Sequence, residues 1–149
     1  MSPAAHYRAL ERMYLAAPIN AFYQPSITVG EAEATIRIAV QTKQFHAAGA
    51  VHGSVYFKML DDAAFFAANS LEPETFVLTS SFTTYLTRPI TSGHLTAVGS
   101  VVHQSRSQFI AEAVARDDQG RVIARGNGIF VRGATPLNQA MGYAAPVDA

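Results

Sequence analysis

Residues 52–68 read HGSVYFKMLDDAAFFAA, and this segment predicts a helix that is apolar on nearly every side. A helix of that kind is normally enclosed within a protein. Two adjacent carboxylates, Asp61 and Asp62, nevertheless lie in its middle. Removing an ionised carboxylate from water costs several kcal/mol unless a partner stabilises it. These two acids are therefore candidate reactive groups.

The predicted helix extends from about residue 52 to residue 71, before Pro73. At its start, the free backbone N–H groups after His52 and Gly53 could hold a negative charge. Lys58 precedes Asp61 by three positions and Asp62 by four. Either spacing permits an ion pair on one helix face, so spacing alone does not select the reactive acid.

Composition limits the function classes. The chain has 149 residues, of which 49% are hydrophobic and 15% are charged, which predicts a single globular domain. The formal net charge is +0 and no run of Lys and Arg occurs, which disfavours a nucleic-acid partner. No apolar run approaches the roughly 20 residues of a membrane span, and no signal peptide is visible. Cysteine is absent, which fits a cytoplasmic location.

Apolar periodicity divides the chain into three parts. Residues 1–25 form an N-terminal helical segment with Ser2 as N-cap and Pro3 in the first turn. Residues 26–133 form an α+β domain, and residues 134–149, rich in Ala, Pro, Asn and Gly, form a loose tail. The domain contains strands at 32–40, 75–87, 94–104, 107–117 and 121–132.

Short polar links join the last four strands, which predicts an antiparallel meander. The enclosed helix then requires a curved five-stranded antiparallel sheet wrapped around it. Such a sheet leaves edges open, and one helix surface uncovered. We therefore expect a homodimer formed through an edge strand, with two central helices side by side.

Three runs resemble the hot-dog fold thioesterases of the PaaI-like (phenylacetic-acid-degradation) branch. They are HAAGAVHGSVYFKMLDDAAFFAANS, TTYLTRPITSGHLTAVGSVVHQSRSQF and DDQGRVIARGNGIFV, and the resemblance covers about residues 32–133. The family pattern is a polar residue, then Gly, then His-Gly-Gly, with an Asp nine residues after the His. Gly49, His52, Gly53 and Asp61 match that pattern.

The chain departs from the family pattern at two positions. His46 occupies the place where Asn is usual, which affects how a substrate carbonyl or a water is positioned. Ser54 replaces the second Gly, a mild change because Ser suits a helix start.

The resemblance implies an acyl-CoA thioesterase that releases a free carboxylic acid and coenzyme A. In that reading Asp61 is the general base or the nucleophile, with Asp62 as the alternative, and the Gly53 amide binds the oxyanion. His52, His46 and Thr79 complete the predicted catalytic group, with Ser80 or Ser81 as alternatives to Thr79. The predicted substrate-binding residues are Ser54, Tyr56, Phe57, Phe65, Arg88, Arg106 and Ser107.

No cofactor is expected beyond the coenzyme A that belongs to substrate and product. The resemblance further implies homodimers that assemble into a homotetramer. A metal site is disfavoured, because His46 and His52 are six residues apart in a loop rather than at a helical i, i+4 spacing. Two other functions stay open: a non-catalytic module that binds acyl-CoA or an acyl carrier, and an acyl-thioester dehydratase.

Overall fold

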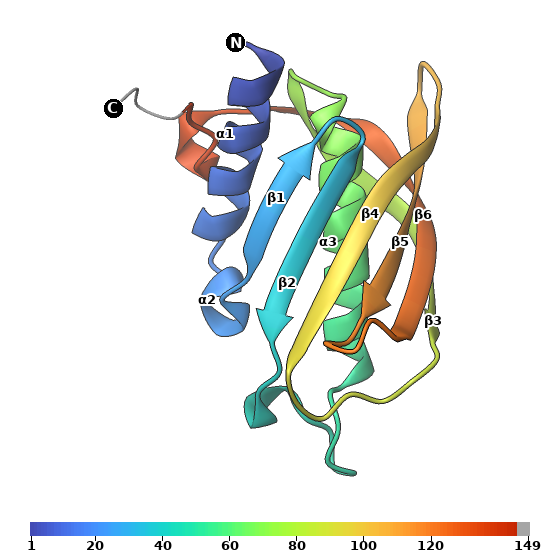
Figure 1. The fold of residues 1–149 in the computed structure, drawn as a ribbon. Helices are drawn as coiled ribbons and strands as arrows, with labels where there is room; N and C mark the ends of the chain where they lie inside the picture. The colour runs from blue at the N-terminus through green and yellow to red at the C-terminus, as the bar shows by residue number, and fades with distance from the viewer. Residues whose placement is uncertain (146–149) are drawn as a thin grey trace.

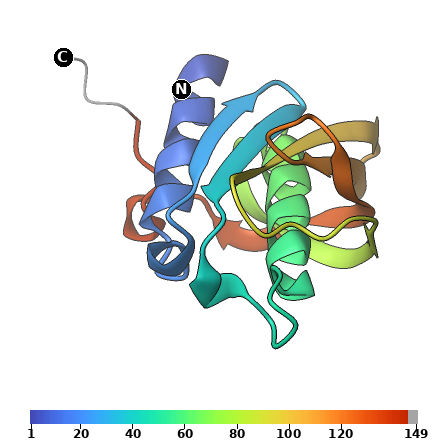
Figure 2. The same cartoon turned by 60° about the horizontal axis from the view of Figure 1, so that its bottom comes forward.

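A six-stranded antiparallel sheet curves around one long helix, α3 (Figures 1 and 2). The computed structural model describes residues 1–145. In chain order the elements are α1 (Pro3–Ala16), α2 (Asn20–Tyr23), β1 (Ser26–Gly30), β2 (Glu33–Ala39), the 3₁₀ turn η1 (Thr42–Gln44), α3 (Gly53–Ser70), β3 (Thr75–Leu86), β4 (His94–Gln104), β5 (Gln108–Arg116), β6 (Val122–Pro136) and the 3₁₀ turn η2 (Gln139–Met141). This is the hot-dog architecture, and the prediction of an α+β hot-dog fold with a long central helix is confirmed.

Helix α3 lies close against the concave face of the sheet because small residues meet there. A Cβ placed on Gly99 of β4 would lie 2.3 Å from the backbone carbonyl of Ala63. Only glycine at that position allows the helix backbone to approach the strand so closely. At the start of α3, the Nδ1 atom of His52 accepts a hydrogen bond from the Ser54 amide at 3.0 Å and caps the helix.

The strand order is β1-β2-β4-β5-β6-β3, which differs from the predicted sheet in two ways. First, the sheet has six strands rather than five, because residues 26–30 form β1 beside β2. Second, the predicted four-strand meander is wrong for β3, which pairs with β6. Strand β4 pairs with β2 on one edge and with β5 on the other, so β3 has no place beside it. Residues 87–93 therefore connect β3 to β4 without forming a hairpin.

The two ends of the described chain meet beside β1. Helix α1 packs against β1, and Ser2 caps it by accepting a hydrogen bond from the Ala5 amide at 3.1 Å. Residues 134–145, predicted to be a loose tail, instead complete β6 and form η2 beside α1 (Figure 1). Leu137, Met141 and Tyr143 pack against the core, which is why this segment is ordered. The rest of that predicted tail, residues 146–149, lies outside the described residues.

Within residues 1–145, no helix combines the length and the apolar character needed to cross a membrane.

Candidate active site

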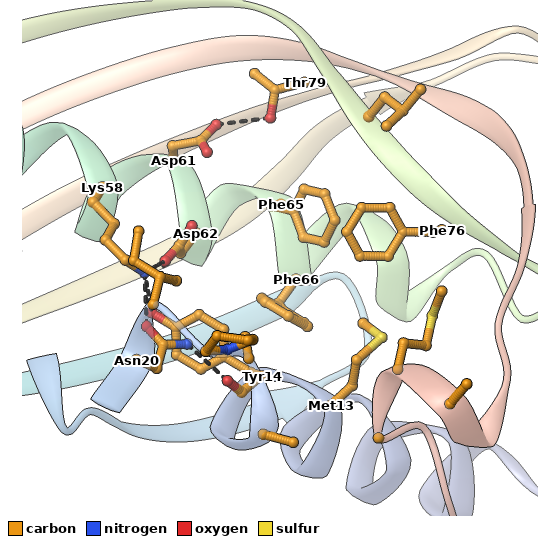
Figure 3. Close-up of a pocket in the computed structure, with 18 of the residues that line it drawn as sticks. Met13, Tyr14, Asn20, Lys58, Asp61, Asp62, Phe65, Phe66, Phe76 and Thr79 are labelled. Carbon is orange, nitrogen blue, oxygen red and sulfur yellow. Dashed lines mark hydrogen bonds and ion pairs between the residues drawn. The ribbon is translucent and has the colours of Figure 1, made fainter. Parts of the chain in front are cut away.

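A cavity of about 730 Å³ lies between α1, α3, β3 and the η2 segment (Figure 3). That volume falls within the range of about 300–1,000 Å³ typical of small-molecule sites. Aromatic, methionine and other apolar side chains make up most of the lining, and Asp61, Asp62 and Lys58 lie at one side. The apolar and aromatic lining residues are Met13, Tyr14, Ile19, Phe65, Phe66, Phe76, Leu78 and Met141.

Asp61 presents a half-buried carboxylate to this cavity. The hydroxyl of Thr79, on β3, donates a hydrogen bond to Oδ1 of Asp61 at 2.9 Å. Burial raises the pKa of Asp61 from 3.8 to about 6, while the Thr79 hydrogen bond opposes that shift. The charge of Asp62 raises the pKa further and that of Lys58 lowers it. A carboxylate with such a pKa is ionised at neutral pH yet basic enough to take a proton from water.

Asp62 occupies a different environment from its neighbour. Its Oδ2 pairs with the Lys58 ammonium and accepts a hydrogen bond from the Tyr14 hydroxyl at 2.7 Å. Lys58 also donates to the Asn20 side chain at 2.9 Å, so the cluster joins α3 to the N-terminal segment (Figure 3). Burial raises the pKa of Tyr14 far above its ordinary value, so Tyr14 remains a neutral donor. Asp62 is therefore committed to partners, whereas Asp61 holds only Thr79.

The N-terminus of α3 lies away from Asp61. Gly53 precedes Asp61 by eight residues on the same helix, which separates them by about 12 Å along its axis. A Cβ placed on Gly53 would lie 3.0 Å from Cδ1 of Leu86, so Gly53 adjoins the end of β3. His52 and Ser54 are exposed beside it, with His52 Nδ1 2.8 Å from the Ser54 hydroxyl. Within one chain, the predicted oxyanion donor and the predicted base are not brought together.

The predicted acyl-contacting residues divide between these two places. Phe65 lines the cavity one helical turn beyond Asp61. Tyr56 is buried, and its hydroxyl donates to the Arg88 carbonyl at 3.0 Å, which ties α3 to the link after β3. Phe57 is exposed and packs edge-on against Phe82 of β3. Tyr56 and Phe57 therefore lie outside the cavity, on the side of α3 that carries Gly53.

The remaining predicted residues lie at the surface. The Nδ1 atom of His46 accepts a hydrogen bond from the Ala48 amide at 3.0 Å, in an exposed loop. Arg88 is exposed after β3, and Arg106 and Ser107 are exposed in the β4–β5 turn, where the Arg106 carbonyl accepts a hydrogen bond from Arg132 at 2.8 Å. Among residues 1–145, no three His, Asp or Glu side chains gather as metal ligands would.

Several cavity residues escaped the sequence analysis. Met13 on α1, Asn20 on α2, Phe76 on β3 and Met141 on η2 each line the cavity. Lys58, considered above only as an ion-pair partner, also lies at its polar side. In the sequence, the Ala, Pro, Asn and Gly of this segment drew attention away from Leu137, Met141 and Tyr143, which pack against the core.

Comparison with known proteins agrees with this architecture. The PaaI protein of Escherichia coli, from the phenylacetic acid degradation operon, superposes with a TM-score of 0.80 at 21% identity, covering 90% of this chain and 99% of that one. A proposed esterase of Mycobacterium tuberculosis superposes with a TM-score of 0.70 at 27% identity, covering 78% and 97%. A mutant thioesterase of Pseudomonas aeruginosa gives a TM-score of 0.73 at 15% identity, covering 83% and 90%.

Curated protein sequences provide no match. The family model described as thioesterase superfamily matches residues 48–124, which contain α3, Asp61 and Thr79. That span is more than half of the chain, and its fold is that of a PaaI-like hot-dog thioesterase. The chain belongs to the thioesterase superfamily.

Proposed function

We propose that the protein is an acyl-CoA thioesterase in which Asp61 is the reacting carboxylate. One observation carries the proposal: a half-buried Asp61 with a pKa of about 6 lies at the side of a mostly apolar cavity. Hydrolysis of a thioester requires such a base or nucleophile beside a pocket for the acyl group. The Thr79 hydroxyl, 2.9 Å from Oδ1, orients the carboxylate.

Two routes use this carboxylate. As a general base, Asp61 takes a proton from water while the water oxygen bonds to the carbonyl carbon. The tetrahedral oxyanion then collapses, the carbon–sulfur bond breaks, and the thiolate takes the proton from Asp61. As a nucleophile, Asp61 bonds to the carbonyl carbon and expels the thiolate, and water then cleaves the mixed anhydride. Single turnover in heavy-oxygen water identifies the second route when label appears in Asp61, because water that attacks the Asp61 carbonyl of the anhydride leaves its oxygen there.

Either route needs a donor for the oxyanion within about 3 Å of it. Gly53 of the same chain is about 12 Å from Asp61 along α3, so its amide cannot serve that role. We therefore place the Gly53 amide of a partner subunit opposite Asp61. The outer edge of β3 supports this dimer, because β3 terminates the sheet and carries the exposed side chains of Leu78, Tyr85 and Leu86.

The contacts between β3 and α3 indicate how the two β3 strands of that dimer are aligned. Thr79 adjoins Asp61, and Leu86 adjoins Gly53. Antiparallel pairing of β3 with its partner copy, with Thr79 opposite Leu86 of the partner subunit, brings each Asp61 toward the other chain's Gly53. In that register the two-fold axis passes between Phe82 and Thr83. The exposed Phe57, beside Phe82, is then covered at the seam.

Free-thiol release from a panel of acyl-CoA substrates tests the activity. Asp61→Asn is expected to abolish release, while the matched control Asp118→Asn, an exposed acid in the β5–β6 turn, retains it. Equal release by wild type and Asp61→Asn contradicts the assigned role. Absence of release by wild type, together with measurable acyl-CoA binding, favours a non-catalytic module.

Mixing of two inactive variants tests the shared site. Asp61→Asn removes the base, and Gly53→Val crowds the amide, because a Cβ there already meets Leu86 at 3.0 Å. In a shared site, a mixed dimer contains one intact pair, Asp61 from one chain and Gly53 from the other. Co-expression is therefore expected to restore part of the activity. Mixed dimers that form but remain inactive contradict the composite arrangement.

Coenzyme A is expected to extend over the surface from this site toward exposed residues at the strand ends. These are Arg88, which follows β3, and Arg106 and Ser107, which follow β4 at the opposite end of the sheet. Guanidinium groups bind phosphate through paired hydrogen bonds. Truncation of either arginine to alanine is expected to raise KM for acyl-CoA more than for a short acyl thioester that lacks the nucleotide. Equal effects on both substrates contradict a phosphate-binding role.

A further inference from the structure

The wall of the cavity opposite Asp61 is made by parts of the chain outside the sheet and α3. Met13 contributes from α1, and residues 139–142, which include Met141, contribute from η2. In Figure 3, Phe65, Phe66 and Phe76 lie between the Asp61–Thr79 pair and Met13. A group that enters beside Asp61 and passes the aromatic rings therefore ends against α1 and η2.

The η2 segment is held in place by a partly buried chain of hydrogen bonds. The Tyr143 hydroxyl donates to His6 Nδ1 at 2.7 Å, and His6 Nε2 donates to the Asn69 carbonyl at 2.9 Å. This assignment follows because a carbonyl can only accept, which leaves Nδ1 as the acceptor for Tyr143. His6 is 4% exposed. The C-terminal segment is therefore joined to α1 and, through α1, to the end of α3.

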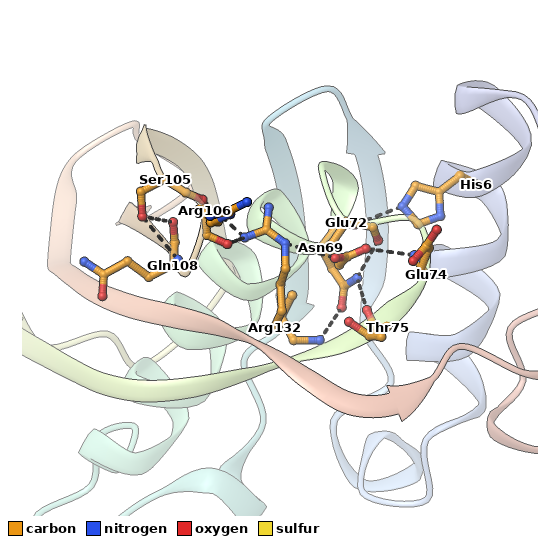
Figure 4. Close-up of polar contacts among 10 residues, drawn as sticks. His6, Asn69, Glu72, Glu74, Thr75, Ser105, Arg106, Gln108 and Arg132 are labelled. Atoms are coloured by element: carbon orange, nitrogen blue, oxygen red, sulfur yellow. Dashed lines mark hydrogen bonds and ion pairs between the residues drawn. The ribbon is translucent and has the colours of Figure 1, made fainter.

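The same anchor extends to the strand that carries Phe76. The Asn69 Oδ1 atom accepts from the Val77 amide at 3.0 Å, and its Nδ2 donates to the Thr75 carbonyl at 3.1 Å (Figure 4). Asn69 is fully buried. Backbone atoms on both sides of Phe76 are thus fixed to the end of α3, so the aromatic part of the pocket and the η2 wall share one support.

Close packing also places η2 against α1. Gly142 has a φ of +84°, and a Cβ added there would lie 2.8 Å from Cβ of Ala16. Glycine adopts this backbone conformation at no steric cost, and it lets η2 approach the helix. Met141, like Met13, then lines the cavity. Methionine side chains are flexible and fill irregular apolar spaces.

The length of the pocket can be gauged from β3. Phe76 precedes Thr79 by three residues, which corresponds to about 10 Å along a strand. The charged residues of the lining, Lys58, Asp61 and Asp62, lie at the cavity's polar side, and the lining residues from η2 carry no charge. A carboxylate at the far end of an acyl group would lie against the apolar side chains of Met13 and Met141, with no cationic side chain among the lining residues at that end.

Given the thioesterase function proposed above, we propose that Met13 and Met141 form the end wall of the acyl pocket. This wall selects an uncharged hydrocarbon or aryl acyl group of limited length. Dicarboxylic acyl-CoA esters of the same length are therefore poor substrates. Met13 and Met141 are specificity-determining residues, because they contact the end of the acyl group and not the reacting atoms.

A chain-length series tests the wall. The ratio of kcat/KM for longer over shorter substrates is measured from butanoyl-CoA to hexadecanoyl-CoA, for wild type, Met141→Ala and Met13→Ala. Each truncation is expected to raise that ratio about tenfold, since one methylene in an apolar pocket discriminates by at least that factor. Ala140→Phe adds bulk at an exposed lining position and is expected to lower the ratio. The matched control, Leu15→Ala, truncates an exposed side chain of α1 outside the lining.

The outcomes separate this proposal from the thioesterase proposal. An unchanged length profile in folded truncation and Ala140→Phe variants, with an active wild type, overturns the wall. If wild type hydrolyses neither this series nor an aryl acyl-CoA, the thioesterase proposal fails. Calorimetry with non-hydrolysable acyl-CoA thioethers of different chain lengths then tests the end wall. A shift of the chain length that binds best in the Met13 or Met141 variants supports the end wall. The same preferred length in wild type and all variants overturns the end wall.

Discussion

Replacement of Asp61 by asparagine is expected to stabilise the fold while it abolishes thioester hydrolysis. Asp61 lies half-buried at the cavity, and burial is the main cause of its raised pKa. An ionised form that is costly in the folded state lowers the free energy of unfolding. Asparagine has nearly the same shape and carries no charge, and its side-chain oxygen can still accept the hydrogen bond from Thr79. The substitution therefore removes a cost and keeps the contact.

The magnitude follows from the shift of the pKa. A rise from 3.8 to about 6 is roughly two units, or about 3 kcal/mol at 1.36 kcal/mol per unit. Because solvent reaches part of the carboxylate, we halve this figure and expect Asp61→Asn to gain about 1–2 kcal/mol at neutral pH. The gain depends on pH. Below the unfolded-state pKa both proteins are neutral at residue 61 and the difference vanishes, and it grows as pH rises through about 6.

Urea denaturation at fixed protomer concentration measures this difference. Wild type and Asp61→Asn are compared from about pH 4 to about pH 8, with Asp118→Asn as the exposed control. In thermal scans near neutral pH the gain corresponds to about 3–6 °C for a chain of this size. A less stable Asp61→Asn protein, or a difference that does not change with pH, would refute the reasoning that Asp61 is held in an unfavourable charged state.

Three further expectations concern the charges of α3 and its contact with the sheet. The kcat/KM of wild type should rise with pH to a plateau, with a midpoint near pH 6. Asp62→Asn should lower that midpoint, because the charge of Asp62 raises the pKa of Asp61. A pH–rate profile of each protein measures the midpoint. Lys58→Met should destabilise the protein by about 3–5 kcal/mol because it leaves the Asp62 carboxylate without a cation, with only the Tyr14 hydroxyl as donor. Lys58→Met combined with Asp62→Leu should recover most of that loss in urea denaturation. Gly99→Ala should cost about 1–3 kcal/mol in the same assay, because its Cβ would lie 2.3 Å from the Ala63 carbonyl.

Each of these has a contradicting result. A midpoint unmoved by Asp62→Asn would mean that the neighbouring charge does not act on Asp61. A double variant as unstable as Lys58→Met would show that Asp62 is not the cause of the loss. A fully stable Gly99→Ala protein would mean that α3 can move away from β4 at no cost.

Local patterns predicted the elements better than their pairing. The helix after His52 and the strands around residues 33–39 and 94–104 agree with the structure, because hydrophobic periodicity reports which face of an element is buried. Periodicity carries no information on which strand is the neighbour. Strand β3 lies beside β6 because β2 and β5 occupy both edges of β4, and that arrangement involves the whole sheet.

The candidate site was predictable only in part. The family register pointed to Asp61, whereas Thr79 was only preferred over Ser80 and Ser81. The structure places the Thr79 hydroxyl 2.9 Å from Asp61 Oδ1, and their chemical role stays a prediction. The separation of Gly53 from Asp61 along α3 was implicit in an eight-residue spacing within one helix. Met13 and Met141 could not be assigned to one cavity from sequence, because their placement depends on how the two ends of the described residues, 1–145, fold back beside β1.

The glycine at position 99 has a consequence for how this scaffold can diversify. Where helix backbone rests directly on strand backbone, no side chain remains between them that mutation could shorten or lengthen. The distance between α3 and β4 is therefore fixed by backbone contact, and so is the position of Asp61 on α3. Adaptation to new acyl groups can then occur through α1 and the η2 segment, whose side chains line the cavity and take no part in the contact between Ala63 and Gly99. Libraries for altered selectivity should randomise those two segments and leave the Ala63–Gly99 contact untouched.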